Sequence, residues 1–219
     1  MKYSLLAAAL LGAASLNAAV VANIQVTGGT AYTGAGFIEG GATDTWNTVN
    51  SGTDTIGDLL GPDGLSSGIS YTPAGFSDPI SYATDDSVTN ALYDNRYIYS
   101  SDATVTFGGL SAGSYDLHIY TGLDGFYNYT FTFDANGVSG SVDYDHTTAA
   151  ITDGVNFLVL SNVSPDINGD IVLTLGNEGA YGAGFSALQI TTSTIPEPST
   201  YAALAGALAL GLVAYRRRR

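Results

Sequence analysis

The sequence predicts an all-β protein, a single antiparallel β-sandwich or jelly roll, and three observations support this fold class. Between residues 23 and 190 the apolar residues recur with a period of two, without a sustained helical period, and this is the spacing of half-buried strands. Gly, Asn, Asp and Ser bound these runs, and they favour turns. The chain contains no cysteine, so a hydrophobic core rather than disulfides has to stabilise it.

Eight segments carry the alternation, and we expect each of them to form a strand. In the segment 113–122, Leu117 and Ile119 share one face while Asp116 and His118 share the other. The expected strands are 23–28, 103–110, 113–122, 127–137, 138–144, 155–163, 171–176 and 185–190. Two packed antiparallel sheets would bury such alternating faces.

Local signals predict the turns and one helix between these strands. Ala-Asn-Gly at 135–137 and Ile-Asn-Gly at 167–169 predict tight turns. Residues 39–96 are richer in Gly, Ser and Asp, which predicts long loops with short strands or a turn of helix. The best helical candidate there is 86–97, with Asp86 or Ser87 as the cap.

The beginning of the chain predicts export. Residues 1–18 combine one basic residue, Lys2, with a short apolar core and an exit of small residues. This is the pattern of a secretory signal peptide rather than of a structural helix. We expect cleavage after Ala18, with Ala19 and Ala22 as the alternatives.

The end of the chain carries a short apolar segment between a proline motif and a basic cluster. In order, it consists of Pro196, Glu197 and Pro198, the apolar run 201–215, and Arg216, Arg217, Arg218 and Arg219. As a helix, the run would rise about 22 Å, less than the roughly 30 Å of a hydrocarbon core. It is therefore a weak anchor, with its arginines on the cytoplasmic side.

This ending, in a chain that also begins with a signal peptide, resembles the PEP-CTERM sorting signal of Gram-negative bacteria. The resemblance implies that signal peptidase and the general secretion machinery export the protein, which is transiently anchored in the inner membrane. By the same resemblance, exosortase, a membrane protease-transferase, is expected to process the tag at or near Pro196–Pro198 and to release the protein to the cell surface or extracellular matrix. A simple single-span anchor with a proline-rich stalk is the alternative.

These signals divide the chain into four parts. They are the signal peptide 1–18, the β-sandwich domain 19–190, the linker 191–195 and the sorting signal 196–219. Of the six Lys and Arg residues, the domain keeps only Arg96, against 19 of the 20 acidic residues, which gives a net charge of about −18. Such a surface repels nucleic acid and anionic lipid. Acidic polysaccharides would need bridging divalent cations, whereas neutral glycans remain compatible.

The stretch 93–122 has a characteristic order of strand and turn signals. A Tyr-rich strand is followed by a strand ending in Gly-Leu, then by Gly-Ser-Tyr and Asp-Leu-His-Ile-Tyr. This order resembles galactose-binding-like jelly rolls, and the segment 184–190 is similar to their closing strand. The resemblance implies carbohydrate binding and a structural calcium near the terminal strands, without choosing its ligands.

A glycan site calls for an exposed aromatic platform beside amide and carboxylate groups. The candidate residues are Trp46, Asn47, Arg96, Asp124, Phe126 and Asn128. Core packing is the alternative for Trp46, and a structural ion pair is the alternative for Arg96.

Metal and catalytic signals are sparse. Asp166, Asn168 and Asp170 have the alternate spacing of calcium-loop ligands, but the glycine of the EF-hand pattern is missing, and a polar turn is the alternative. His118 shares a strand face with Asp116, so a carboxylate could orient its imidazole, and a strand-face histidine paired with its neighbours is the alternative to a catalytic role. We therefore expect an exported, non-catalytic carbohydrate-binding protein. The alternatives are a structural or adhesive matrix protein without a discrete ligand, and a glycoside hydrolase or polysaccharide lyase.

Overall fold

The computed structural model describes the central part of the chain. The described residues are 18–26, 32, 41–76, 80–81, 96–100, 103–121, 129–144, 152–177 and 183–193. One compact unit spans Ala19–Ser193. The predicted signal peptide, apart from its last residue, and the predicted sorting signal lie outside the described residues, and no described helix could cross a membrane.

The described part is built from strands, which confirms the all-β prediction. In chain order the strands are β1 (Val20–Val26), β2 (Asn47–Val49), β3 (Ser70–Ala74), β4 (Ile80–Ser81), β5 (Arg96–Ser100), β6 (Ala103–Gly108), β7 (Tyr115–Tyr120), β8 (Tyr129–Ala135), β9 (Val138–Tyr144), β10 (Phe157–Val163), β11 (Ile171–Asn177), β12 (Ala183–Phe185) and β13 (Ala187–Thr192). Every segment that the alternation singled out contains a strand, because a half-buried strand is what a period of two encodes.

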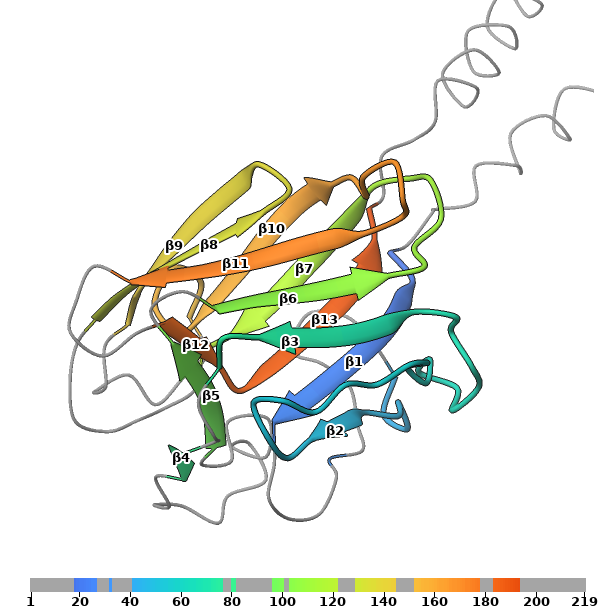
Figure 1. Cartoon of the computed structure of the whole chain (residues 1–219), viewed down its shortest axis with the longest axis horizontal. Coiled ribbons are helices and arrows are strands. Elements are labelled where there is room, and N and C mark those ends of the chain that lie inside the picture. Colours follow the sequence, from blue (N-terminus) through green and yellow to red (C-terminus); the bar gives the residue numbers. More distant parts are fainter. Residues whose placement is uncertain are drawn as a thin grey trace, which may run out of the picture. The chain divides into compact units, whose positions relative to one another are not determined.

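Two five-stranded sheets lie against each other in a sandwich (Figure 1). Sheet I has the order β10-β7-β13-β1-β2, and sheet II has the order β3-β6-β11-β8-β9. Neighbouring strands are antiparallel except for the pair β1 and β2. A smaller group, β12-β5-β4, lies at one end. The chain therefore forms the β-sandwich that the sequence predicts.

The core lies between the two sheets, where alternate residues of each strand face inward. In β6, Val105 and Phe107 are fully buried, whereas Thr104 and Thr106 face outward. From sheet I, Leu117 of β7 enters the same cluster. Each fully buried side chain of this size contributes about 1.5 to 3 kcal/mol relative to exposure.

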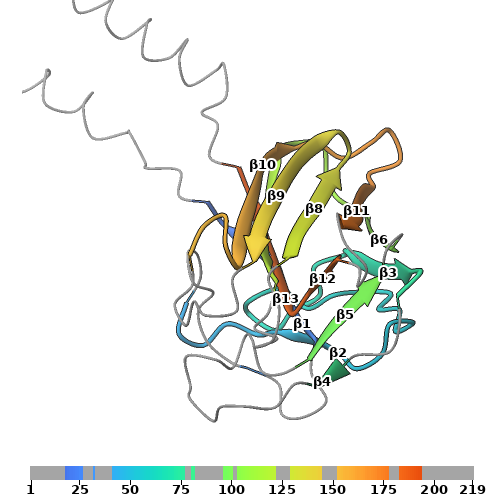
Figure 2. The same ribbon diagram turned by 90° about the vertical axis from the view of Figure 1, so that its left-hand side faces the viewer.

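The two sheets also meet along one side, where β9 lies beside β10 (Figure 2). Gly140 of β9 allows this approach. A Cβ atom at that position would lie 2.9 Å from a methyl carbon of Leu160 and 3.0 Å from one of Leu158. The glycine is therefore explained by packing, since a side chain there would have to displace the methyl groups of Leu158 and Leu160.

The β8–β9 hairpin turns as the sequence predicts. Asn136 and Gly137 have φ angles of 49° and 89°, and a type I′ turn requires positive φ at both positions. The Asn136 amide nitrogen donates hydrogen bonds to the carbonyl oxygens of Ser164 (3.0 Å) and Asp170 (2.9 Å). Its amide oxygen accepts one from Val172 N at 3.0 Å. The hairpin thereby also fixes the connection between β10 and β11.

Two boundary predictions were wrong. Thr191 and Thr192, predicted as linker, belong to β13, where they pair with Asp116 and Tyr115. The predicted helix 86–97 ends in residues that form the start of β5, and its remainder lies outside the described residues. In both cases pairing with a distant strand outweighs local propensity.

Candidate functional site

Trp46 is a core residue, so its predicted place in an exposed platform was wrong. It is only 4% exposed and clusters with Tyr120, Phe157 and Ala187 on the outer face of sheet I. The ring of Tyr32 meets it edge-on, with 5.6 Å between ring centroids and an interplanar angle of 69°. This second, smaller core covers apolar side chains that would otherwise face water.

Asn47 also has a structural role, which corrects its assignment to a ligand site. Its side-chain amide nitrogen donates to the carbonyl oxygens of Asn23 (2.9 Å) and Leu60 (2.8 Å). Its amide oxygen accepts a hydrogen bond from Leu60 N at 2.8 Å. Both protons of the amide nitrogen are thus used inside the fold. Together these hydrogen bonds attach the connection after β2, at Leu60, to β1 of sheet I, at Asn23.

The remaining predicted ligand residues stay predictions. Arg96 is described only as the first residue of β5, paired with Ser81. Asp124, Phe126 and Asn128 lie outside the described residues. The same holds for the sorting residues Pro196, Glu197, Pro198, Arg216, Arg217, Arg218 and Arg219.

The loop 166–170 is closed by its own aspartate. Oδ1 of Asp166 accepts hydrogen bonds from the backbone N–H groups of Asn168 (2.8 Å) and Asp170 (2.9 Å), and its Oδ2 accepts one from the Asn168 amide (3.2 Å). These donors lower the pKa of the Asp166 carboxyl. Calcium binding by Asp166, Asn168 and Asp170 stays a prediction, and it would compete with these hydrogen bonds. No group of three acidic or histidine side chains suited to a metal occurs in the described part.

A row of polar side chains is buried on the outer face of sheet I. His118 Nε2 lies 3.1 Å from Thr191 Oγ1, and the amide nitrogen of Gln189 donates to Asn23 Oδ1 at 2.9 Å. Burial lowers the pKa of His118, while the nearby Asp116 raises it. The Nδ1 atom of His118 has no hydrogen-bond partner in the described part, and Thr191 is fully buried. The pair therefore lacks both the orienting acceptor and the accessible nucleophile of a hydrolytic triad.

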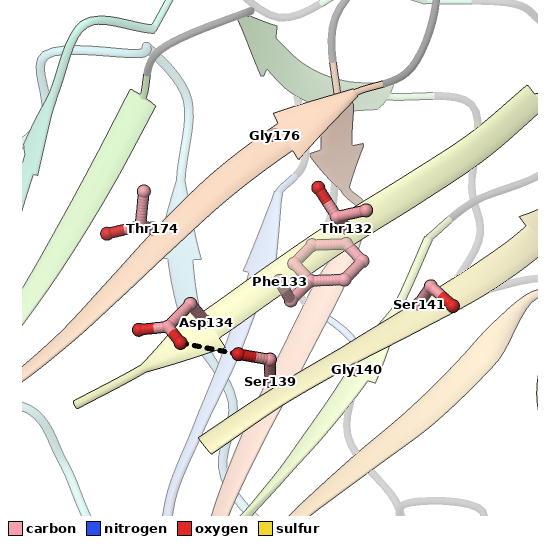
Figure 3. Close-up of a pocket in the computed structure, with 8 residues that line it drawn as sticks. All are labelled: Thr132, Phe133, Asp134, Ser139, Gly140, Ser141, Thr174 and Gly176. Carbon is pink, nitrogen blue, oxygen red and sulfur yellow. Dashed lines mark hydrogen bonds between the residues drawn. The ribbon is translucent and has the colours of Figure 1, made fainter. Parts of the chain in front are cut away.

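The outer face of sheet II instead carries short Thr, Ser and Asp side chains, and it has an open groove of about 480 Å³. We call it the β8–β9 groove, and its lining residues are Thr132, Phe133, Asp134, Ser139, Gly140, Ser141, Thr174 and Gly176 (Figure 3). Its volume falls within the range of small-ligand sites. Phe133 is 1% exposed and belongs to the core between the sheets. Carbon atoms make up most of the accessible surface of the groove, and hydroxyl groups and one carboxylate supply its polar part.

Strand register arranges these groups in two adjacent rows. Thr174 of β11 pairs with Asp134 of β8, which pairs with Ser139 of β9. The second row, two residues along each strand, consists of Gly176, Thr132 and Ser141. Neighbouring strands lie about 4.8 Å apart, so each row presents its groups at regular intervals on one face.

Asp134 is held in place within the groove. Its Oδ2 accepts a 2.6 Å hydrogen bond from the Ser139 hydroxyl (Figure 3). Its Oδ1 accepts a hydrogen bond from Gly137 N at 3.1 Å. In contrast, the hydroxyls of Thr132, Ser141 and Thr174 make no hydrogen bond to described residues. A hydroxyl both donates and accepts, so these three groups are available to a ligand.

The sequence analysis predicted β8 and β9 but missed the groove. The alternation in 130–134 and 139–143 already places Thr132, Asp134 and Ser139 on one face, and the Asn-Gly turn sets their register. The contribution of β11 could not be found in this way, because β11 lies next to β8 without following it in the sequence. The chain matches no protein-family model and no curated protein, so similarity assigns no family to it.

Proposed function

We propose that the chain is an exported protein, sorted by a PEP-CTERM signal to the bacterial cell surface or extracellular matrix, whose galactose-binding-like β-sandwich binds polysaccharide without catalysis. The β8–β9 groove is the observation that carries the binding proposal. It combines three hydroxyls available to a ligand with one carboxylate already oriented by Ser139 and Gly137. Sugar hydroxyls need such paired donors and acceptors.

The proposal is tested by retention of the protein on polysaccharides. The full chain, purified in mild detergent, is applied to a panel of soluble and insoluble polymers, with calcium and with a chelator. We expect retention on at least one polymer class, with a melting temperature that rises as the soluble polymer is added, because a ligand that binds the folded state stabilises it. A folded protein that no polymer retains would contradict the proposal.

A structural or adhesive matrix role without a discrete ligand is the second candidate. It is favoured by one property of the groove: Phe133, the only aromatic residue among its described lining residues, points into the core and offers no ring for a sugar face. In that case the protein should fractionate with extracellular polymer while binding no purified polysaccharide. An enzyme is a weaker candidate, since the groove lining includes one carboxylate and glycoside hydrolysis generally uses two.

A further inference from the structure

We infer that the β8–β9 groove takes a stretch of an uncharged polysaccharide and that Gly176 keeps the site open. This inference rests on the proposed polysaccharide binding, and it adds the place, the ligand class and the determining residue. Its basis is the cross-strand geometry around Gly176, Thr132 and Thr174.

Gly176 is not required by the backbone. It lies within β11, opposite Thr132, in a regular antiparallel register, and it is not among the described glycines with positive φ. Glycine weakens a strand interior and often marks the place where another backbone or a ligand comes close. Gly140 is explained by the close side chains of Leu158 and Leu160, whereas Gly176 faces outward into the groove.

A side chain at position 176 would fill the groove. A Cβ atom there would lie 2.7 Å from Thr132 Oγ1, which is too close for the present position of that hydroxyl. Alanine would therefore force the Thr132 hydroxyl to rotate, and valine would also cover the space beside Thr174. Because both changes point away from the core, they block the groove without removing a core contact.

The charges around the groove favour an uncharged ligand. Asp134 is the charged residue of the lining, and the next row along the strands carries Asp143, whose Oδ1 accepts the Thr130 hydroxyl at 2.9 Å. The domain has no lysine and a single arginine, Arg96. A uronate or sulfate group would therefore meet repulsion from two carboxylates, whereas neutral sugar hydroxyls can donate to Asp134.

The test compares two groove variants with two matched controls, using the full chain in detergent. The groove variants are Gly176→Val and Thr174→Val. The controls are Gly113→Ala, where a Cβ atom would meet nothing within 4 Å, and Thr104→Val, which pairs with Thr174 on the same sheet face but outside the lining. Affinity is measured by calorimetry for soluble neutral glucan and mannan and, with and without calcium, for an acidic alginate.

We expect Gly176→Val to weaken binding of the neutral polymer at least about tenfold, because its side chain fills the groove, and Thr174→Val about threefold, because one hydrogen bond to the ligand is lost. Both controls should bind as the wild-type chain does. Binding should change little between about 0.05 M and 0.5 M salt, because screening acts on charge pairs. If Gly176→Val fails to fold, Thr174→Val together with Ser141→Ala gives the same comparison.

Three results would overturn the inference. If the groove variants bind a neutral polymer as well as the wild-type chain does, the site lies elsewhere and polysaccharide binding itself stands. If only alginate binds, and only with calcium, the ligand class is wrong. If the folded wild-type chain binds none of the polymers, the proposed function fails together with the inference.

Discussion

The hydroxyl of Ser193 donates a short hydrogen bond to Oδ1 of Asp116, which joins the last described residue of the domain to β7. The same oxygen accepts a hydrogen bond from Asn162 N at 2.8 Å. Asn162 has a φ of 62° and lies in the irregular stretch of β10, between its pairings at Leu160 and Val163. One carboxylate thus holds three separate segments at the end of sheet I.

Replacing Asp116 should therefore destabilise the domain. We expect Asp116→Ala to lower the free energy of unfolding by about 1 to 3 kcal/mol, because two donors lose a charged acceptor. Urea unfolding followed by circular dichroism measures this loss. The control is Asp153→Asn, an exposed aspartate whose side chain makes no described hydrogen bond. Equal stability of Asp116→Ala and the wild-type chain would show that the contact contributes nothing.

The burial of His118 leads us to expect that the free energy of unfolding decreases in mild acid. Burial lowers its pKa in the folded state below the value of about 6.5 in the unfolded chain, so the unfolded state binds the proton first. Stability is then full above about pH 6.5 and falls as the pH drops from there towards the folded-state pKa. His118→Gln should flatten this part of the profile, as measured by urea unfolding between about pH 7 and pH 5. An unchanged slope would assign the decline to other groups.

Asn136 should stabilise the domain through both its backbone conformation and its side-chain hydrogen bonds. Asn136→Ala loses three hydrogen bonds and places a Cβ-bearing residue without polar compensation at positive φ, so we expect a loss of about 2 kcal/mol or more. Asn136→Gly keeps the conformation and loses only the hydrogen bonds. The difference in the free energy of unfolding between the two variants, from thermal or urea unfolding, gives the cost of a positive φ for a residue with a Cβ atom. A more stable alanine variant would contradict this assignment.

Trp46 is the single tryptophan of the chain, so the tryptophan fluorescence measures the environment of the second, smaller core. We expect blue-shifted fluorescence, weak quenching by acrylamide and no change when a polysaccharide binds in the groove. Trp46→Ala should cost about 3 to 5 kcal/mol, as for other large core residues. Strong quenching in the folded protein would place the ring at the surface and restore it as a candidate platform.

The sorting proposal has its own test in cells. Replacing Pro196, Glu197 and Pro198 by alanine should trap the full-length chain in the inner membrane, because the resemblance assigns processing to this motif. Fractionation and immunoblotting follow the precursor and the released form. Alanine at Ser199 and Thr200, directly after the motif, is the matched control. Normal release of the triple variant would favour a different export route.

Much of the fold could be predicted because its signals are local. Alternation along β6, β7 and β8 follows from which residues face the core, and the turn at Asn136 follows from the positive φ that Asn and Gly accept. The wrong boundary at Thr191 and the exposed position expected for Trp46 both depended on contacts with residues far away in the sequence. Local pattern carries no information about such contacts.

The sequence by itself therefore determined the fold class, the strands, the hairpin turn and the acidic, cysteine-free character of the domain. Only the tertiary structure decided that β11 lies beside β8, that Trp46 and Asn47 are buried, and that hydroxyl groups from three strands form one groove. The physical reason is the same in each case. Propensity and alternation act over a few residues, whereas strand order and burial are set by which arrangement of whole sheets covers the most apolar surface.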